Sequence, residues 1–186
     1  MKNKIRAVTT AVILSLTACP NLALAETPPN SVMEQLKAYQ TAEANTAVHI
    51  KTFDTLDFGV YSNQKWDRLK ESHAADILVH YPDGSTTKGL DAHIAALKPM
   101  FIFAPDTKIT THPVKFGQGD WTGVIGVMTG TFTKPMPTGD GKTIALTGKH
   151  FEFQMSTIGH WTSAGVMDEE YLFWDNAAFM KQIGLS

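Results

Sequence analysis

The chain has 186 residues, of which 43% are hydrophobic and 18% charged, and its formal net charge is −2. This composition is typical of a globular protein with a core and excludes an intrinsically disordered chain. It also argues against a nucleic-acid partner, because proteins that bind nucleic acid neutralise phosphates with clustered lysine and arginine. Beyond residue 25 the only arginine is Arg68.

Residues 1–25 have the pattern of a secretory signal peptide. The basic start "MKNKIR" precedes the apolar run "AVTTAVILSLTA", and "ALA" directly before Glu26 is a typical cleavage site. Alternatively, "LTAC" resembles the lipobox of a lipoprotein, which would place a lipid on Cys19, although Pro20 makes this less favourable. We expect an exported protein, periplasmic or secreted, with no membrane association unless it is lipidated at Cys19.

Cleavage after Ala25 would remove Cys19, the only cysteine of the chain. The mature protein would then have no disulfide, no thiolate nucleophile and no cysteine-based metal site. Three basic residues and no acidic residue would be lost with the signal peptide, so the mature chain would be more acidic.

The first half of the chain is predicted to be mostly helical. Residues 26–31, "ETPPNS", form a linker, and Ser31 with Glu34 makes a capping box that starts a helix extending to about residue 56. Further helices are predicted at 62–73, "SNQKWDRLKESH", and 89–103, "GLDAHIAALKPMFIF". The run "DILVHYP" between them predicts a strand that ends at Pro82.

The second half predicts strands joined by short turns. The β-rich runs are "KITTHPVKFG", "WTGVIGVMTGTFT", "KTIALTGKHFEFQMSTIGHW" and "GVMDEEYLFW". Asp175 then caps a closing helix, "NAAFMKQIG". This order predicts an α+β fold in which a curved antiparallel sheet and helices packed on one of its faces enclose a pocket.

Three segments match one known family in residue type and order. They are "HYPDGSTTKGLDAHIAAL", "TGTFTKPMPTGDGKTIALTGKHFEF" and "EEYLFWDNAAFMKQIGL". On these residues the chain resembles the SnoaL-like polyketide cyclase and ester cyclase group of the NTF2-like superfamily, with residues 32–186 as its domain. The resemblance implies a conical α+β barrel around an apolar cavity and a homodimer formed through the sheet. It also implies chemistry without a cofactor or metal, because the best-known members close a ring by aldol condensation unaided.

The chain departs from that family at one position. In the cyclases an acid/base aspartate lies three residues before the aspartate that opens the closing helix, which corresponds to Asp175 here. The catalytic position therefore falls on Leu172, which cannot transfer a proton. Two functions remain open for a protein that binds a small apolar carbonyl compound. One is an acid/base cyclase, isomerase or dehydratase, and the other is a non-catalytic ligand-binding or dimerisation module of the same fold.

The candidate catalytic residues are Glu170, His150 and Glu152. Strand residues alternate between two faces, and the resemblance places the Leu172 face, which includes Glu170, inside the cavity together with His150 and Glu152 of the preceding strand. We predict that the three side chains converge, with Glu170 as the base that takes a proton from a carbon next to a carbonyl. The alternative is a hydrogen-bonded polar layer that only orders the cavity wall.

Six further residues are predicted to contact the ligand: His80, Tyr81, His112, Asp168, Leu172 and Trp174. Tyr81 matches a polar cavity position of the cyclases, although a tyrosine hydroxyl bonded at the rim of a core is an equal alternative. The remaining histidines, His49, His73, His93 and His160, are interpreted as surface or helix residues. No two histidines have the spacing typical of metal ligands, so no metal site is predicted.

Overall fold

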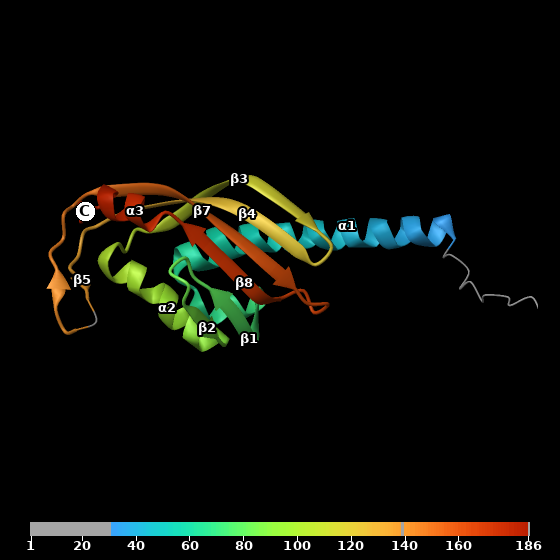
Figure 1. Cartoon of the computed structure of the whole chain (residues 1–186), viewed down its shortest axis with the longest axis horizontal. Coiled ribbons are helices and arrows are strands. Elements are labelled where there is room, and N and C mark those ends of the chain that lie inside the picture. Colours follow the sequence, from blue (N-terminus) through green and yellow to red (C-terminus); the bar gives the residue numbers. More distant parts are fainter. Residues whose placement is uncertain (1–30, 139, 186) are drawn as a thin grey trace, which may run out of the picture.

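The long helix α1 (Val32–Asp54) is the first element of the computed structural model, which describes residues 31–138 and 140–185 (Figure 1). The predicted capping box is present, since the Ser31 hydroxyl accepts from the Glu34 N–H and the Glu34 carboxylate accepts from the Ser31 N–H. The predicted signal peptide, Cys19 and the linker up to residue 30 lie outside the described residues. No helix within the described part is both long and apolar enough to cross a membrane.

The helices that follow are shorter. α1 runs into a π-helical turn, η1 (Thr55–Val60), and two 3₁₀ segments, η2 (Tyr61–Asn63) and η3 (Trp66–Glu71). The second predicted helix is therefore present only as the 3₁₀ segment η3. α2 (Leu90–Phe103) and the closing helix α3 (Asn176–Gln182) agree with the prediction.

Six strands form one curved sheet in the order β2-β1-β8-β7-β4-β3. They are β1 (His73–His80), β2 (Thr86–Lys88), β3 (Lys108–Gln118), β4 (Trp121–Thr131), β7 (His150–Trp161) and β8 (Met167–Trp174). A small separate hairpin pairs β5 (Met136–Pro137) with β6 (Thr143–Ile144). The predicted α+β fold is confirmed.

The pairing of β1 with β8 is parallel, whereas the other pairs of the sheet are antiparallel. The last strand of the meander β3-β4-β7-β8 lies beside β1, the first strand of the chain. In the chain, β2 and α2 lie between β1 and the meander. The helical elements then cover the concave face of the sheet (Figure 1).

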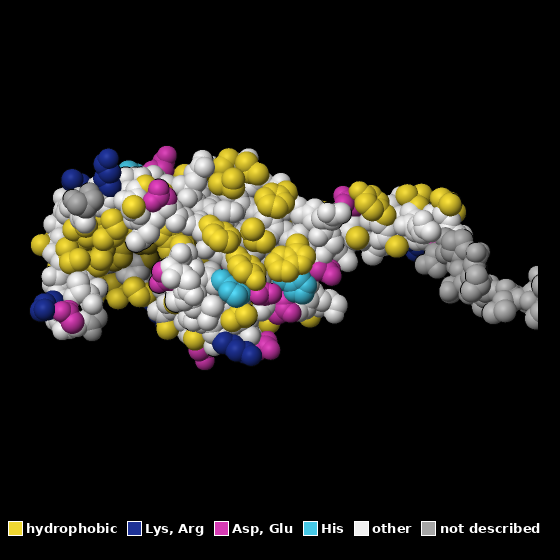
Figure 2. Space-filling view, in the orientation of Figure 1, with side chains coloured by type: hydrophobic (Ala, Val, Ile, Leu, Met, Phe, Trp, Pro, Cys, Tyr) yellow, Lys and Arg dark blue, Asp and Glu magenta, His cyan; other side chains and the backbone are white. Residues whose placement is uncertain are grey.

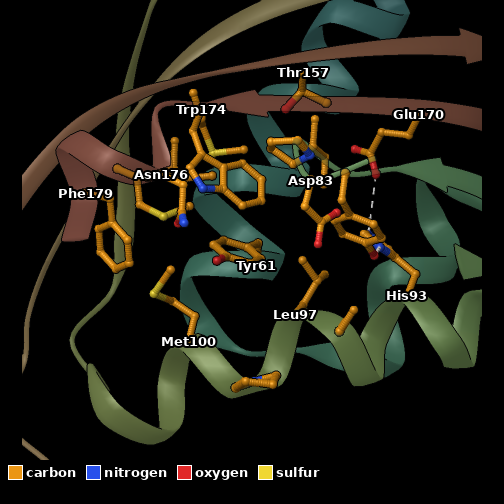
Figure 3. Close-up of a pocket in the computed structure, with 18 of the residues that line it drawn as sticks. Tyr61, Asp83, His93, Leu97, Met100, Thr157, Glu170, Trp174, Asn176 and Phe179 are labelled. Atoms are coloured by element: carbon orange, nitrogen blue, oxygen red, sulfur yellow. Dashed lines mark hydrogen bonds and ion pairs between the residues drawn. The ribbon is translucent and has the colours of Figure 1, made fainter. Parts of the chain in front are cut away.

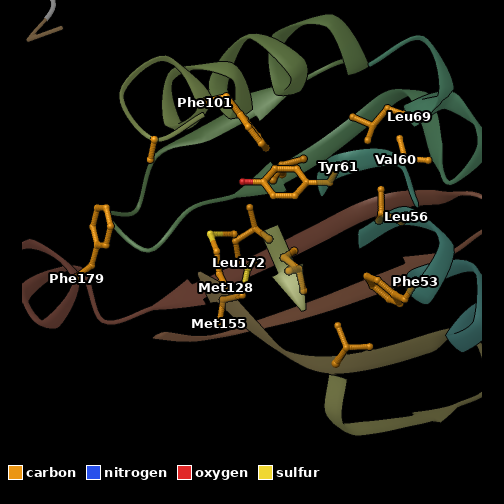
Figure 4. Packing of buried hydrophobic residues seen from close by; sticks show 14 of the residues in the cluster. Phe53, Leu56, Val60, Tyr61, Leu69, Phe101, Met128, Met155, Leu172 and Phe179 are labelled. Atoms are coloured by element: carbon orange, nitrogen blue, oxygen red, sulfur yellow. The ribbon is translucent and has the colours of Figure 1, made fainter. Parts of the chain in front are cut away.

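The core lies between that concave face and the helices. Leu56 and Tyr61 from the helical turns and Phe101 from α2 point toward Met128, Met155 and Leu172 of the strands (Figure 4). Phe151 on β7 is fully buried, and its neighbours His150 and Glu152 are exposed. The odd-numbered residues of β7 therefore face the core, and this orientation decides which β7 side chains can reach a site inside.

Candidate functional site

A cavity of about 900 Å³ lies between α2 and the concave face of the sheet. Most of its wall is apolar, with Leu97 and Met100 from α2 on one side and Trp174 and Phe179 at one end (Figure 3). The polar groups that line it are Asp57, Tyr61, His73, Tyr81, Asp83, Ser85, Thr87, His93, Thr157, Glu170, Asp175 and Asn176. A ligand of this cavity would therefore be mostly apolar, with its polar atoms directed to a few positions.

Glu170 is the most deeply buried acidic side chain of the cavity, with an exposed fraction of 3%. It points inward from β8 and Glu169 points outward, as the family resemblance and the alternation of strand faces together predicted. The Glu170 Oε2 atom lies 3.7 Å from Nε2 of His73 on β1 and 3.5 Å from Nε2 of His93 on α2 (Figure 3). Across the β7–β8 pairing Glu170 is opposite Gly159, where the side chains of Met167 and Phe53 occupy the space that a side chain would take.

Burial and mutual proximity set the charges of this cluster. Burial opposes the ionisation of Glu170, but its interactions with the adjacent His73 and with His93, when these rings are protonated, outweigh it, so the pKa of Glu170 lies below its ordinary value. Burial lowers the pKa of His93 to about 4. At neutral pH the site therefore combines an ionised carboxylate with a neutral imidazole.

A second carboxylate, Asp57, reaches the cavity from the π-helical turn η1. Its Oδ2 atom accepts a hydrogen bond from His112 Nε2 at 2.7 Å, and His112 Nδ1 bonds Asp54 at 2.8 Å. Burial raises the pKa of Asp57, and the His112 hydrogen bond offsets this only in part. Burial opposes the charge of His112 as well, but its two carboxylate partners prevail and raise its pKa.

The predicted convergence of His150 and Glu152 with Glu170 is wrong. Both side chains lie on the exposed face of β7, because the apolar Phe151 and its odd-numbered neighbours occupy the core. The register separates them as well, since Gly159 is opposite Glu170 and lies seven residues from Glu152, about 23 Å along the strand. A short turn at residues 162–166 joins the two strands.

Asp168 also lies outside the cavity, against the prediction. A β-bulge interrupts the β7–β8 pairing, so that His160 is opposite Glu169 but Trp161 is opposite Met167. The bulge turns both Met167 and Glu170 inward, and Asp168 instead bonds His160 at 2.6 Å on the outer side.

The other predicted ligand-contacting residues divide into three groups. Tyr81, Leu172 and Trp174 line the cavity. His112 does not line it but supports Asp57, which does. The prediction for His80 is wrong, because its ring stacks on Tyr171 and bonds Glu169 at 2.9 Å on the outer side of the sheet.

Three cavity residues were missed from the sequence: His73, His93 and Asp57. Of the histidines interpreted as surface or helix residues, His49 and His93 do lie in helices but are buried. The interpretation is wrong for His73, which is buried in strand β1. A signal existed for His93, which stands three residues after Leu90 and four before Leu97 and therefore shares the apolar face of α2. The ligand-type atoms of His73, His93 and Glu170 lie within 4.8 Å of one another although they come from three separate elements.

Comparison with known proteins supports the fold and the family. Residues 55–183 match the model of the SnoaL-like polyketide cyclase family. A search of curated proteins found no match.

Three solved structures illustrate the likeness. A candidate SnoaL-like polyketide cyclase from Jannaschia sp. CCS1 superposes with a TM-score of 0.64 and 18% identity, covering 75% of this chain and 94% of that one. IdmH, a candidate polyketide cyclase from Streptomyces antibioticus, gives 0.60 and 20%, with 72% and 96% covered. A protein with a ketosteroid isomerase-like fold from Catenulispora acidiphila gives 0.53 and 16%, with 68% and 87% covered. Because the family match spans most of the chain, the protein belongs to the SnoaL-like polyketide cyclase family.

Proposed function

We propose that the protein binds a small, largely apolar carbonyl compound in its cavity and transfers a proton from the carbon beside the carbonyl. The observation that carries this proposal is an apolar cavity of about 900 Å³ with two buried carboxylates, Asp57 and Glu170, in its wall. Reactions of this kind include cyclisation, isomerisation and dehydration. The family match supports a ligand-binding cyclase or isomerase fold.

Asp57 is the better proton acceptor of the two carboxylates. A general base works best when its pKa lies near the working pH, and burial moves the pKa of Asp57 upward, whereas that of Glu170 is lowered. The sequence assigned the base to Glu170, and this proposal moves that role to Asp57. His112 would keep its hydrogen bond to Asp57 throughout the transfer and so hold the carboxylate in position.

The carbonyl oxygen would lie at the end of the cavity where Tyr81 and His93 are. The Tyr81 hydroxyl lies 2.9 Å from His93 Nδ1, and burial raises the pKa of Tyr81, so the hydroxyl keeps its proton and can donate. In reactions of this class, stabilising the negative charge that forms on the oxygen contributes a large part of the rate enhancement. The apolar body of the ligand would then extend along Leu97 and Met100 (Figure 3).

Solvent deuterium exchange tests the proposal without knowledge of the product. A panel of apolar ketones would first be screened by thermal shift, since a bound ligand stabilises the native state. For each binder, loss of the proton signal beside the carbonyl would be followed by NMR in D₂O. We expect catalysed exchange that Asp57→Asn abolishes and that Asp83→Asn retains, because Asp83 is an exposed carboxylate at the cavity wall.

One observation favours a second function, ligand binding without turnover. Leu172 lines the cavity at the position where the cyclases carry their acid/base aspartate. Ketone binding without any catalysed exchange would support this second function and overturn the first. Absence of binding across the panel would contradict both.

We also propose that the protein is exported and dimeric. The pattern of residues 1–25 supports export, and the mass of the mature protein tests it: cleavage after Ala25 leaves Glu26 as the first residue, whereas lipidation leaves a modified Cys19. Exposed apolar side chains on the outer face of the sheet, including Phe116, Trp121 and Phe173, support a homodimer through that face. Figure 2 shows apolar side chains gathered there beside histidine and acidic ones.

A further inference from the structure

Three side chains from separate elements direct their terminal atoms at one point beside the cavity. His73 begins β1, His93 lies in the first turns of α2, and Glu170 lies in the middle of β8. Glu170 Oε2 is 3.7 Å from His73 Nε2 and 3.5 Å from His93 Nε2, and all three atoms lie within 4.8 Å of one another. Ligands held at 2.0–2.2 Å around a tetrahedral metal are about 3.4 Å apart, so the two distances from Glu170 to the histidines are close to those of a metal site.

Two of the three atoms in this cluster have no hydrogen-bond partner in the described part of the chain. Among the described residues, the buried His73 Nε2 and Glu170 Oε2 make no hydrogen bond, and the exposed fractions of their side chains are 1% and 4%. Buried polar atoms are nearly always paired, and a separation of 3.7 Å is too long for a hydrogen bond. Two unpaired buried atoms that face each other indicate that a further atom belongs between them.

The opposite edges of both imidazole rings are held by hydrogen bonds. His73 Nδ1 lies 3.2 Å from the Leu69 carbonyl oxygen, which can only accept, and 2.9 Å from Ser72 Oγ, whose own proton can be donated to Leu69. These contacts accommodate a proton on Nδ1, and in that tautomer the Nε2 lone pair faces the cluster. His93 Nδ1 lies 2.9 Å from the Tyr81 hydroxyl oxygen, which can accept a hydrogen bond from it, so that the Nε2 lone pair of His93 can face the cluster. Histidine ligands of metals are oriented by bonds of this kind on their second nitrogen.

From this geometry we propose that His73, His93 and Glu170 bind a divalent first-row transition metal ion. Two imidazoles and one carboxylate suit Zn²⁺, Fe²⁺ or Mn²⁺, whereas Mg²⁺ and Ca²⁺ prefer an all-oxygen set. Three protein ligands leave at least one coordination position open, as in catalytic zinc sites. Because all three residues line the cavity, that position would face the bound ligand.

The metal site would also have a role in the proposed proton transfer, and this role, unlike metal binding itself, rests on the proposed function. A metal in this position would bind the carbonyl oxygen and stabilise the negative charge that develops on it when the neighbouring carbon loses its proton. Glu170 would then act as a ligand, and Asp57 would remain free to accept the proton.

Metal binding itself is tested without any carbonyl compound. Tag-free protein is dialysed against a chelator and then titrated with Zn²⁺ by calorimetry and with Co²⁺ by visible absorption, which reports the coordination geometry. We expect one ion per chain with a micromolar or tighter Kd. His73→Gln, His93→Gln and Glu170→Gln should each weaken Kd by more than about 100-fold, since loss of a mere supporting partner already costs 10–100-fold.

His80→Gln is the matched control, because His80 also pairs with a glutamate but lies on the outer side of the sheet. It should bind the metal as the unmodified protein does, and Tyr81→Phe should weaken binding by about tenfold. Near-ultraviolet circular dichroism identifies a variant that fails to fold, in which case the other two ligand variants decide. The proposal is overturned if the metal-free protein binds neither ion at millimolar concentration, or if Glu170→Gln and His93→Gln retain binding. A negative ketone screen leaves this result unaffected, so the two proposals can fail separately.

Discussion

His93 Nε2 lies 3.5 Å from Glu170 Oε2, although the two residues belong to a helix and a strand that are far apart in the chain. This contact joins α2 to β8 at the cavity, whose wall is otherwise mostly apolar (Figure 3). The effect of removing this contact on the free energy of unfolding distinguishes a structural from a functional role of the cluster.

Glu170→Gln should change the free energy of unfolding of metal-free protein by no more than about 1 kcal/mol. The substitution removes a carboxylate whose Oε2 has no hydrogen-bond partner to lose, and the cost of burying its charge offsets most of its attraction to the histidines. Urea unfolding of both proteins measures the difference. A loss of about 3–5 kcal/mol, as expected when a buried ion pair is broken, would instead assign the cluster a structural role.

The stability contribution of His112 should decline as pH rises above about 6.5, the ordinary pKa of histidine. Its pKa in the folded protein is raised, so the folded state binds the proton more tightly than the unfolded state does. The contribution is therefore complete below the unfolded pKa and is lost as pH rises through the folded pKa. Melting temperatures measured from pH 6 to pH 9 test this. His112→Gln should remove the decline attributable to this residue, whereas His150→Gln should leave it, because the His150 side chain is exposed.

Gly130→Ala should destabilise the protein by about 1–3 kcal/mol, the usual cost of overpacking a core. A Cβ atom at this position would lie 2.5 Å from Cζ of Phe151, a fully buried ring that cannot move aside. Gly59→Ala is the control, because the nearest atom to its added Cβ is 3.9 Å away and the residue lies in a helical turn. It should leave the unfolding free energy unchanged or raise it slightly. Equal losses in both variants would contradict the packing argument.

Phe173→Lys should convert the proposed dimer into a folded monomer. Phe173 is half exposed on the outer face of β8, and a lysine there would place a charge in the apolar centre of the interface. Light scattering coupled to size-exclusion chromatography measures the mass, and circular dichroism checks the fold. Leu146→Lys, a similarly exposed apolar residue beyond β6, should leave the dimer intact. A monomeric unmodified protein at micromolar concentration would rule out the dimer.

The sequence by itself determined the order and type of most elements. Local signals were sufficient because capping, turn chemistry and the period of apolar residues act over a few residues. The capping box at Ser31 and the helix cap at Asp175 are both present. Alternation of faces along one strand put Glu170 and Leu172 on the same side of β8, and the family resemblance placed that side inside the cavity, where both residues lie.

Only the tertiary structure decided which residues share the site. Strand alternation states which residues of β7 lie on one face, but it does not state which face packs inward, and Phe151 competes for the core more strongly than His150 does. One bulge then moved Asp168 to the outside. His73, His93 and Asp57 meet Glu170 at the cavity because β1, α2 and η1 are folded against β8, and no spacing along the chain encodes that distance.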